Sequence, residues 1–448
     1  MKSASFEFAV WGDGLSEWLT AAALAMAGRS AALLLTRPLD RESGAFPGYP
    51  ADLAGSEIIA NHFGEAPAGA ADNPWQADLQ VVWPGRRLDI FADPVEFFFG
   101  LNRDAPDQAR PLITASTGLR KVAEKIEREI LARADYPPFA WRERFLYRFK
   151  GIERAVPQLG RTLNDLLHEH GVAEEMKWLF LLPLKALCPD LRANPGLGTA
   201  AVLWNFLLRQ QRGTGSADLR LRLREIIRRN GEVFESPPDR VALHQGGVRA
   251  VLLANKTEVQ PRILIAEPAA VFAVLDPAQR EETAGRKLAL LFPRLVRHTL
   301  FFRVERAALP EAMARRVVVL NDPAAPLEGP NFLTLCRIPR VPRWETLAVT
   351  ATYPKGDVPP PPPEELLHAL HWLFPFLGRD QVEIEPERPP LSRHHYALPK
   401  HAGFFPRHHH TPLKNVFLPP DQVLPGLGPQ ANFLFISALM HQFPKPSA

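Results

Sequence analysis

The chain has 448 residues, of which 46% are hydrophobic and 23% charged, a composition typical of a globular protein with two or three domains. The formal net charge of +4 is small and the basic residues are dispersed, which excludes a typical nucleic-acid-binding protein. The apolar runs are too short to span a membrane, and Met1 leads directly into a predicted strand, so we expect no membrane helix and no signal peptide. Cys188 and Cys336 lie far apart, as expected of unpaired thiols in the cytoplasm.

The N-terminal segment predicts a strand, a glycine turn, a helix and a second strand. Residues 6–10 and 31–35 are apolar, and residues 18–28 are rich in alanine and leucine with helical spacing. Gly12 and Gly14 stand between the first strand and the helix. In dinucleotide-binding sheets the first glycine permits the turn, the second admits a pyrophosphate, and the helix N-terminus offers N–H groups to the anion.

Two carboxylates in this turn oppose an anion. Asp13 lies between the two glycines, and Glu17 occupies the position where a third glycine is usual. A phosphate beside them would need compensating cations, and the turn itself supplies none. The segment therefore predicts the scaffold of a nucleotide site more strongly than it predicts the nucleotide.

The next elements predict a mixed protein. A hairpin is expected over residues 79–91 around a Pro-Gly turn, and helices follow from 117 to about 212. Within them, residues 178–187 are apolar on all sides, so this helix should be buried or face a lipid-like ligand. The later elements are expected in this order: a helix at 217–230, strands at 232–234, 240–243, 248–253 and 262–266, strands at 298–304, 316–320, 332–338 and 347–353, a polyproline spacer at 359–363, a helix at 364–377, a strand at 415–418 and a helix at 431–443.

Three segments resemble the superfamily of flavin-dependent phytoene desaturases and amine oxidases, which also contains the Rab GDP-dissociation inhibitors. The first reads V-W-G-D-G-L-S-E at residues 10–17, and Gly28 ends its helix. The second runs from a glycine-rich turn at 213–215 through a helix, a hairpin and a strand that ends at 266. The third reads N-V-F-L-P-P-D at residues 415–421, before a glycine loop and the closing helix.

The resemblance implies an α/β fold with a Rossmann-like FAD/NAD(P)-binding domain and a discontinuous α+β substrate lobe of antiparallel sheet and helices. The nucleotide-binding domain would comprise residues 1–84, 213–268 and 410–448. The substrate lobe would comprise a helical part, residues 85–212, and a β-rich part, residues 269–409. FAD would then lie extended across the three parts of the first domain.

The resemblance also implies which residues would contact FAD. Asp421 matches an acidic residue that positions the ribityl-phosphate, although it is equally suited to capping the following segment. Val241 would pack near the adenine, although a valine in a strand is more often a core residue. The expected cofactor-binding residues are Gly12, Gly14, Leu15, Ser16, Thr36, Arg37, Gly44, Val241 and Asp421.

Several residues depart from the superfamily pattern. The second strand ends in Leu35-Thr36-Arg37, where the family has a glutamate that binds the adenosine ribose. Ser43-Gly44-Ala45 replaces Gly-Gly-Arg, and Pro420 replaces a glycine and so removes a backbone N–H. The Gly-x-Gly-Leu-Ser-Glu form is closer to the dissociation-inhibitor branch, which carries no cofactor.

A histidine-rich segment is the other notable feature. Its composition, with prolines and few carboxylates, favours a solvated or interface loop over a metal site, and contact with the flavin region is a third interpretation. We identify no catalytic side chain and expect no metal. The histidines are His394, His395, His401, His408, His409 and His410.

Two hypotheses follow for the function. The first is an FAD-dependent oxidoreductase in which a hydrophobic substrate, isoprenoid or lipid-like, transfers a hydride to the flavin. The second is a cofactor-free protein on the same fold that binds a lipid group or a protein partner. Both are compatible with a cytoplasmic protein in peripheral contact with a membrane, and both leave the substrate, the electron acceptor and the oligomeric state open.

Overall fold

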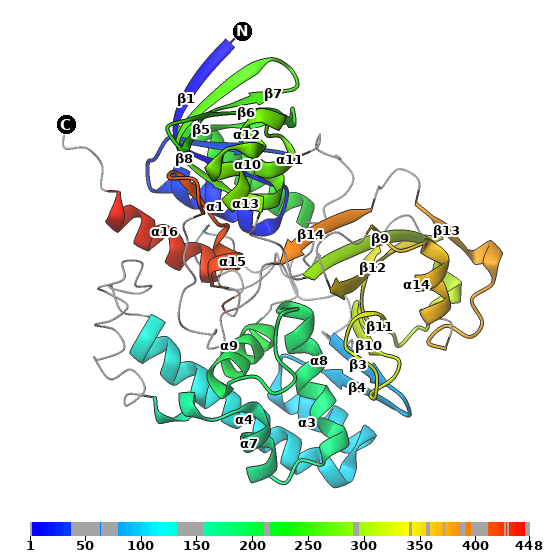
Figure 1. Cartoon of the computed structure of the whole chain (residues 1–448). Coiled ribbons are helices and arrows are strands. Elements are labelled where there is room, and N and C mark those ends of the chain that lie inside the picture. The colour runs from blue at the N-terminus through cyan, green and yellow to red at the C-terminus, as the bar shows by residue number, and fades with distance from the viewer. Residues whose placement is uncertain are drawn as a thin grey trace.

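The computed structural model describes residues 2–36, 63, 79–131, 156–209, 216–289, 295–339, 343–354, 359–370, 372–385, 390–395, 411–424, 427 and 430–443. These residues form two sheets and a helical lobe, arranged around a common centre in Figure 1. The expected mixed α/β class with a second, largely antiparallel sheet is confirmed.

The first sheet is built around parallel strands from both ends of the chain. Its order is β5-β2-β1-β8-β7-β6, and β15 pairs with β8. Strands β5, β2, β1, β8 and β15 are parallel, whereas β6 and β7 form an antiparallel hairpin that continues to β8. The strands are β1 (Lys2–Trp11), β2 (Ala31–Leu34), β5 (Gly231–Phe234), β6 (Pro238–His244), β7 (Gly247–Leu253), β8 (Thr257–Ala266) and β15 (Val416–Phe417).

Helices cover both faces of this sheet, which explains why its central strands are apolar throughout. Phe8 and Val10 of β1 belong to the core on the α1 side, and Ala9 and Trp11 belong to the core on the opposite side. Helix α1 packs against α10, α15 and α16. The helices are α1 (Leu15–Met26), α10 (Ser216–Asn230), α15 (Pro420–Val423) and α16 (Gln430–Gln442) on one face, and α11 (Pro268–Ala273), α12 (Pro277–Glu281) and α13 (Thr283–Ala289) in the connection after β8.

The second sheet has the order β13-β9-β12-β11-β10-β3-β4, and β14 also pairs with β9. Only the β10–β3 pair is parallel among the pairs described. We expected the first domain segment to extend to residue 84, yet β3 pairs with β10 and so belongs to this second sheet. The strands are β3 (Leu79–Trp83), β4 (Arg86–Ile90), β9 (Leu295–Glu305), β10 (Arg316–Leu320), β11 (Gly329–Pro339), β12 (Trp344–Pro354), β13 (Val382–Ile384) and β14 (Leu391–His395).

The helical lobe packs against the second sheet through α8, which contacts β3 and β10. Helix α8 is buried over most of its length, as its apolar sequence predicts, and α9 is buried throughout. The Trp204 indole N–H on α9 donates to the Ser116 hydroxyl on α4 at 2.9 Å and joins these two helices. The helices are α3 (Pro94–Asp104), α4 (Pro106–Ile126), α7 (Leu163–Glu169), α8 (Trp178–Leu187) and α9 (Leu197–Leu208), and α14 (Pro363–Leu370) lies on the second sheet.

Short helical turns complete the described elements. They are a π-helical turn at Glu127–Leu131 and 3₁₀ turns at Pro157–Gly160, Glu174–Lys177, Arg306–Ala308 and Arg379–Gln381. Among the described helices, none combines the length and the apolar composition that crossing a bilayer requires. Strand β14 matters most for the site, because it pairs with β9 in the second sheet and lies between that sheet and the α1 side of the first (Figure 1).

Candidate functional site

The glycine turn has the backbone conformation that the sequence predicts. Gly12 has a φ of +148°, which disfavours any side chain, and its N–H donates to the Leu34 carbonyl at 3.0 Å. Gly14 precedes α1, and its carbonyl accepts the N–H of Trp18 at 3.2 Å to begin the helix. The turn is therefore anchored to the end of β2, where a nucleotide-binding sheet places its cofactor.

Asp13 closes the space between this turn and the end of β2. One carboxylate oxygen accepts the N–H of Thr36 at 2.6 Å, and the other accepts the Thr36 hydroxyl. Thr36 was among the expected cofactor-binding residues. Its hydrogen-bonding groups are instead occupied by the chain itself.

Glu17 folds back over the glycine turn. Its Cγ lies 2.8 Å from the position that a Cβ atom on Gly12 would occupy, and only 2% of the residue is exposed. A helix N-terminus attracts negative charge, and here a carboxylate of the helix's own first turn lies where a dinucleotide-binding sheet holds a phosphate.

Arg393 supplies the cation that the turn lacks. It reaches in from β14, and its Nη1 and Nη2 donate to the two carboxylate oxygens of Glu17 at 3.3 and 3.2 Å. Nη2 also donates to the Asp421 carboxylate. A Cβ atom placed on Gly14 would overlap with Nη1 of Arg393 and Oε2 of Glu17, so the space above the second glycine is filled.

Asp421 brings the C-terminal segment to the same place. It lies in the first turn of α15, which packs against α1, and its side chain is 9% exposed. The expected meeting of Gly12, Gly14 and Asp421 on one cradle is therefore present, and the Arg393 guanidinium joins its two sides. We call Glu17, Arg393 and Asp421 the cradle cluster.

The cradle cluster changes the protonation of Glu17. Burial raises the pKa of this carboxyl to about 7; Arg393 opposes the rise, whereas Asp421 and Glu267 add to it. Near neutral pH, Glu17 is therefore close to half protonated.

Polar groups also bind the final helix to α1. The Asn432 side-chain oxygen accepts the Ser16 hydroxyl at 2.8 Å and the Thr20 hydroxyl at 3.0 Å. Leu15 beside them is buried. Ser16 and Leu15 thus lie beside the glycine turn, where cofactor-binding residues were predicted. The Ser16 hydroxyl bonds to α16, and Leu15 packs in the core.

The other predicted contact residues lie elsewhere. Val241 is fully buried in β6, and its N–H donates to the Val274 carbonyl at 3.3 Å, as a core residue would. Arg37 and Gly44 lie outside the described residues, as do His401 and His408 to His410, and the side chains of His394 and His395 are also outside them. Among the described side chains, no group of three or more histidines, cysteines, aspartates or glutamates is placed to bind a metal.

The residues present do not fit the diphosphate of FAD. The position above Gly14 holds the Arg393 guanidinium, and two carboxylates, Glu17 and Asp421, lie on either side of it. Pro420 has no N–H to offer an anion. A diphosphate there would displace a buried ion pair and then face both carboxylates.

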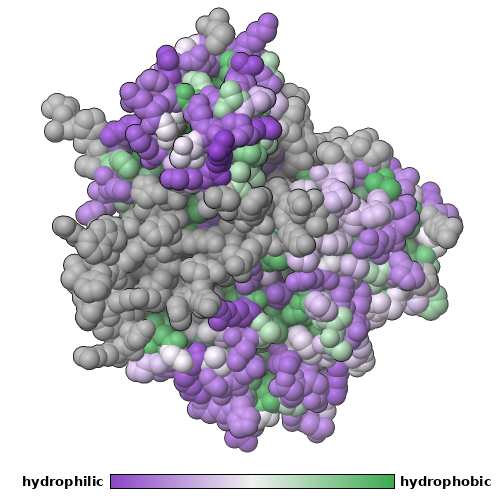
Figure 2. Space-filling model, viewed as in Figure 1, coloured by the Kyte–Doolittle hydropathy of each residue, from purple (hydrophilic) through white to green (hydrophobic). Residues whose placement is uncertain are grey.

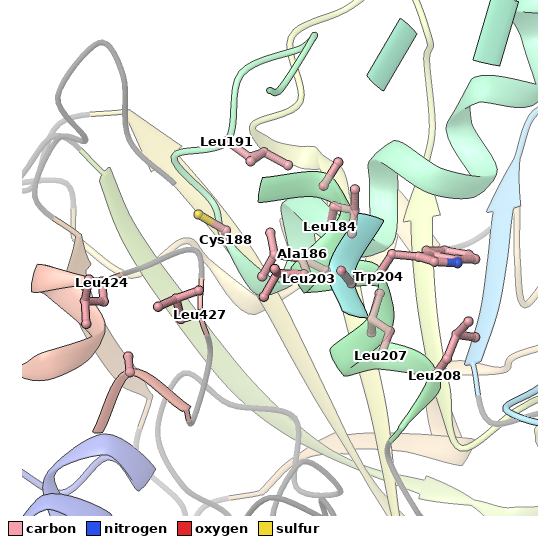
Figure 3. Close-up of a cluster of buried hydrophobic side chains, with 14 of the residues drawn as sticks. Leu184, Ala186, Cys188, Leu191, Leu203, Trp204, Leu207, Leu208, Leu424 and Leu427 are labelled. Atoms are coloured by element: carbon pink, nitrogen blue, oxygen red, sulfur yellow. The ribbon is translucent and has the colours of Figure 1, made fainter. Parts of the chain in front are cut away.

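An apolar layer adjoins the cradle. Leu424 and Leu427 follow Asp421, and in Figure 3 they lie across from side chains at the end of α8 and on α9, among them Cys188 and Leu203. These side chains belong to one buried hydrophobic cluster. The polar cradle and the apolar helices are therefore joined through the segment that carries Asp421.

The surface visible in Figure 2 contains both hydrophilic and hydrophobic residues. Over the described part of the face in Figure 2, hydrophilic residues predominate and hydrophobic ones are dispersed among them. Some large apolar side chains are exposed in the whole molecule, including Phe99 on α3 at 65% and Phe376 at 91%.

Comparisons with known proteins identify the fold. No family model and no curated protein matches the sequence. Among solved structures, Rab GDI from Plasmodium falciparum matches over 99% of each chain with a TM-score of 0.53 and 8% identity. An oxidoreductase from Methanosarcina mazei covers 97% of this chain and 100% of its own, with a TM-score of 0.49 and 13% identity. Cyclohexylamine oxidase from Brevibacterium oxydans covers 98% and 99%, with a TM-score of 0.46 and 15% identity.

The similarity to Rab GDI shows a shared fold. The chain has the architecture of Rab GDI over nearly its full length, so the expected fold is supported. Arg393 is the site residue that the sequence analysis missed. The available signal was indirect, because the two carboxylates of the turn required a cation from a distant segment.

Proposed function

We propose that this chain is a cofactor-free binding protein on the Rab GDI fold. The observation that carries the proposal is the Arg393 guanidinium, which fills the space above Gly14 and pairs with Glu17 and Asp421. In this arrangement the carboxylates of Glu17 and Asp421 and the guanidinium of Arg393 occupy the cradle. The geometry of the fold then serves to hold the domains together and to present a binding surface.

Burial makes the plugged cradle difficult to open for a cofactor. Arg393, Glu17 and Asp421 have side chains that are 5%, 3% and 9% exposed. Removing one member of a buried ion pair leaves an uncompensated charge, which costs about 3–5 kcal/mol. FAD would have to offset that cost and bring two further negative charges to the two carboxylates.

The ligand that we propose is an apolar group, free or attached to a protein partner. Two features support this choice: the apolar side chains of α8 and α9 that face Leu424 and Leu427 (Figure 3), and the fold shared with a protein named for its Rab partner. These side chains are buried in the structure, and a lipid chain that entered between them would be held by the hydrophobic effect.

Flavin loading tests the proposal. The purified chain, incubated with FAD and passed through a desalting column, should retain no flavin absorbance, and FAD should not raise its melting temperature. A ligand that binds only the native state raises that temperature as its concentration increases. Retained flavin together with a rising melting temperature would refute the proposal. Gly14→Glu is the matched site variant, because loss of that flavin in the variant would locate it in the cradle.

The same experiment decides the alternative hypothesis of an FAD-dependent oxidoreductase acting on a hydrophobic substrate. Its support is the assembled cradle, in which the N-terminal turn and Asp421 meet as the superfamily resemblance implies. Retained flavin that is reduced by an added substrate would favour the oxidoreductase.

A further inference from the structure

The cradle cluster contains more negative than positive groups. The charged groups that face Glu17 from the described elements are Arg393 of β14, Asp421 of α15 and Glu267, which precedes α11. With all groups ionised, the two carboxylates of the cluster would share one guanidinium, and Glu267 adds to the negative potential at Glu17. A proton on Glu17 reduces this excess, which a poorly solvated site tolerates only at a cost.

Asp421 gives an independent sign of the same imbalance. Its Oδ2 accepts Arg393, but its buried Oδ1 has no hydrogen-bond partner among the described residues. A buried carboxylate oxygen without a donor is costly. The energetic cost of this buried negative charge is therefore reduced either by a proton in the cluster or by movement of the cluster into water.

Strand β14 is the element whose movement would expose the cradle cluster to water. It has five residues and pairs with β9 over Leu295–Thr299, while β13 occupies the neighbouring part of β9. Arg393 lies in the middle of β14, and its head group touches α1 and α15 of the other sheet's domain. The Arg393 side chain on this short strand thus connects the second sheet to the glycine turn.

We propose that the cradle cluster is a proton-controlled latch. When Glu17 carries a proton, Arg393 holds β14 against the glycine turn. When Glu17 is ionised, the excess negative charge favours a state in which β14 separates from the turn and Glu17 is hydrated. The latch rests on the proposed function, since a resident cofactor would take the place of Arg393.

Proton linkage sets the size of the effect. In an open, hydrated state the pKa of Glu17 returns toward 4.5, whereas burial in the closed state raises it to about 7. The closed state therefore binds more protons between these pH values, and the opening constant rises by about tenfold per pH unit in that range. Above pH 7 the opening constant levels off at up to about 300 times its value in acid.

Hydrogen exchange of the full chain, measured by mass spectrometry between pH 5 and 8, tests the latch. Peptides that cover 391–395 and 12–18 are compared after correction for the intrinsic exchange rate. We expect their protection to fall by about tenfold or more from pH 5 to pH 7.5 in the wild type. Peptides of α9 should keep their protection, because the Trp204 and Asn205 side chains bond this helix to Ser116 and Glu127 of the helical lobe.

Two variants make the test specific. Glu17→Gln removes the titrating group at similar size, so protection at 391–395 should become independent of pH. Asp421→Asn removes one of the groups that raises the pKa of Glu17, so the fall in protection should move to lower pH. Equal pH profiles in the wild type and Glu17→Gln, or an equal loss of protection in α9, would overturn the latch. Flavin content, measured separately on the same samples, tests the proposed function independently.

Discussion

The Nη2 atom of Arg393 lies 3.2 Å from Oε1 of Glu17, although 376 positions separate the two residues. Because Arg393 lies on a strand of the second sheet and Glu17 lies in the first turn of the helix after β1, the pair joins the two sheets at the turn where a dinucleotide fold receives its cofactor. The guanidinium of Arg393 thereby supplies a positive charge at that turn.

Removing this cation should destabilise the protein strongly. Arg393→Met retains much of the side-chain volume but leaves Glu17 and Asp421 buried without their partner. We expect the free energy of unfolding at pH 5.5, where the cluster is closed, to fall by about 3–5 kcal/mol, because the buried charge of Asp421 is left uncompensated. Urea denaturation with an unchanged m-value is the measurement.

An exposed ion pair provides the control for that variant. Arg286 pairs with Glu281 at 3.2 Å, with side chains 69% and 76% exposed. Arg286→Met should change the free energy of unfolding by less than about 0.5 kcal/mol. Equal effects of the two substitutions would contradict a structural role for the cradle cluster.

The stability of the wild type should decrease as pH rises through the neutral range. Burial raises the pKa of Glu17 from 4.5 in the unfolded chain to about 7. Between these pH values the native state holds a proton on Glu17 that the unfolded state has released. The contribution of this proton to the free energy of unfolding is therefore complete below pH 4.5 and is lost as pH rises to about 7. This loss is up to about 3 kcal/mol.

Glu17→Gln isolates this contribution. Subtracting its pH profile of unfolding free energy from that of the wild type removes the other titrating groups. We expect a difference that grows between pH 5 and 7 in favour of the variant. Parallel profiles would show that Glu17 has an ordinary pKa and is not buried as described.

The space above Gly14 can be tested by adding one methyl group. Gly14→Ala has an acceptable backbone conformation, with φ −73° and ψ 163°, but its Cβ would overlap with Arg393. We expect a loss of about 1–3 kcal/mol in the free energy of unfolding. At Gly160 an added Cβ would have no neighbour within 4 Å, so Gly160→Ala should have little effect.

A double-mutant cycle shows which neighbour causes that loss. In an Arg393→Ala background the methyl group of Gly14→Ala gains space, so its cost should fall by at least about 0.5 kcal/mol. Strict additivity of the two substitutions would show that Arg393 does not fill the space above Gly14.

Much of the fold could be predicted from the sequence because local patterns determine it. The apolar runs of β1 and β2, the glycine turn and the two-residue turn between β3 and β4 are local signals, and the structure has each of them. Helix α3 was not predicted, although Asp93 caps it and Pro94 begins it. The assignment of β3 to the second sheet also depends on a distant partner, β10, which no local pattern identifies.

The site could be predicted only in part for the same reason. The positions of Gly12 and Asp421 followed from their flanking elements, and the structure brings both to the cradle. Arg393 directly precedes His394 and His395 of the histidine-rich segment, but no local pattern assigns it a partner, so its role appears only when the two sheets are placed together. From the sequence, Asp13 and Glu17 implied only that a bound phosphate would need compensating cations, and the pairing of Arg393 with Glu17 was not predicted.

A crystal structure of the protein grown at pH 5.5 with saturating FAD would test the central claim most directly. We predict electron density for the Arg393 guanidinium between Glu17 and Asp421, directly above Gly14. Density for a pyrophosphate at that position, with the arginine displaced, would contradict the claim that this chain closes its own nucleotide cradle.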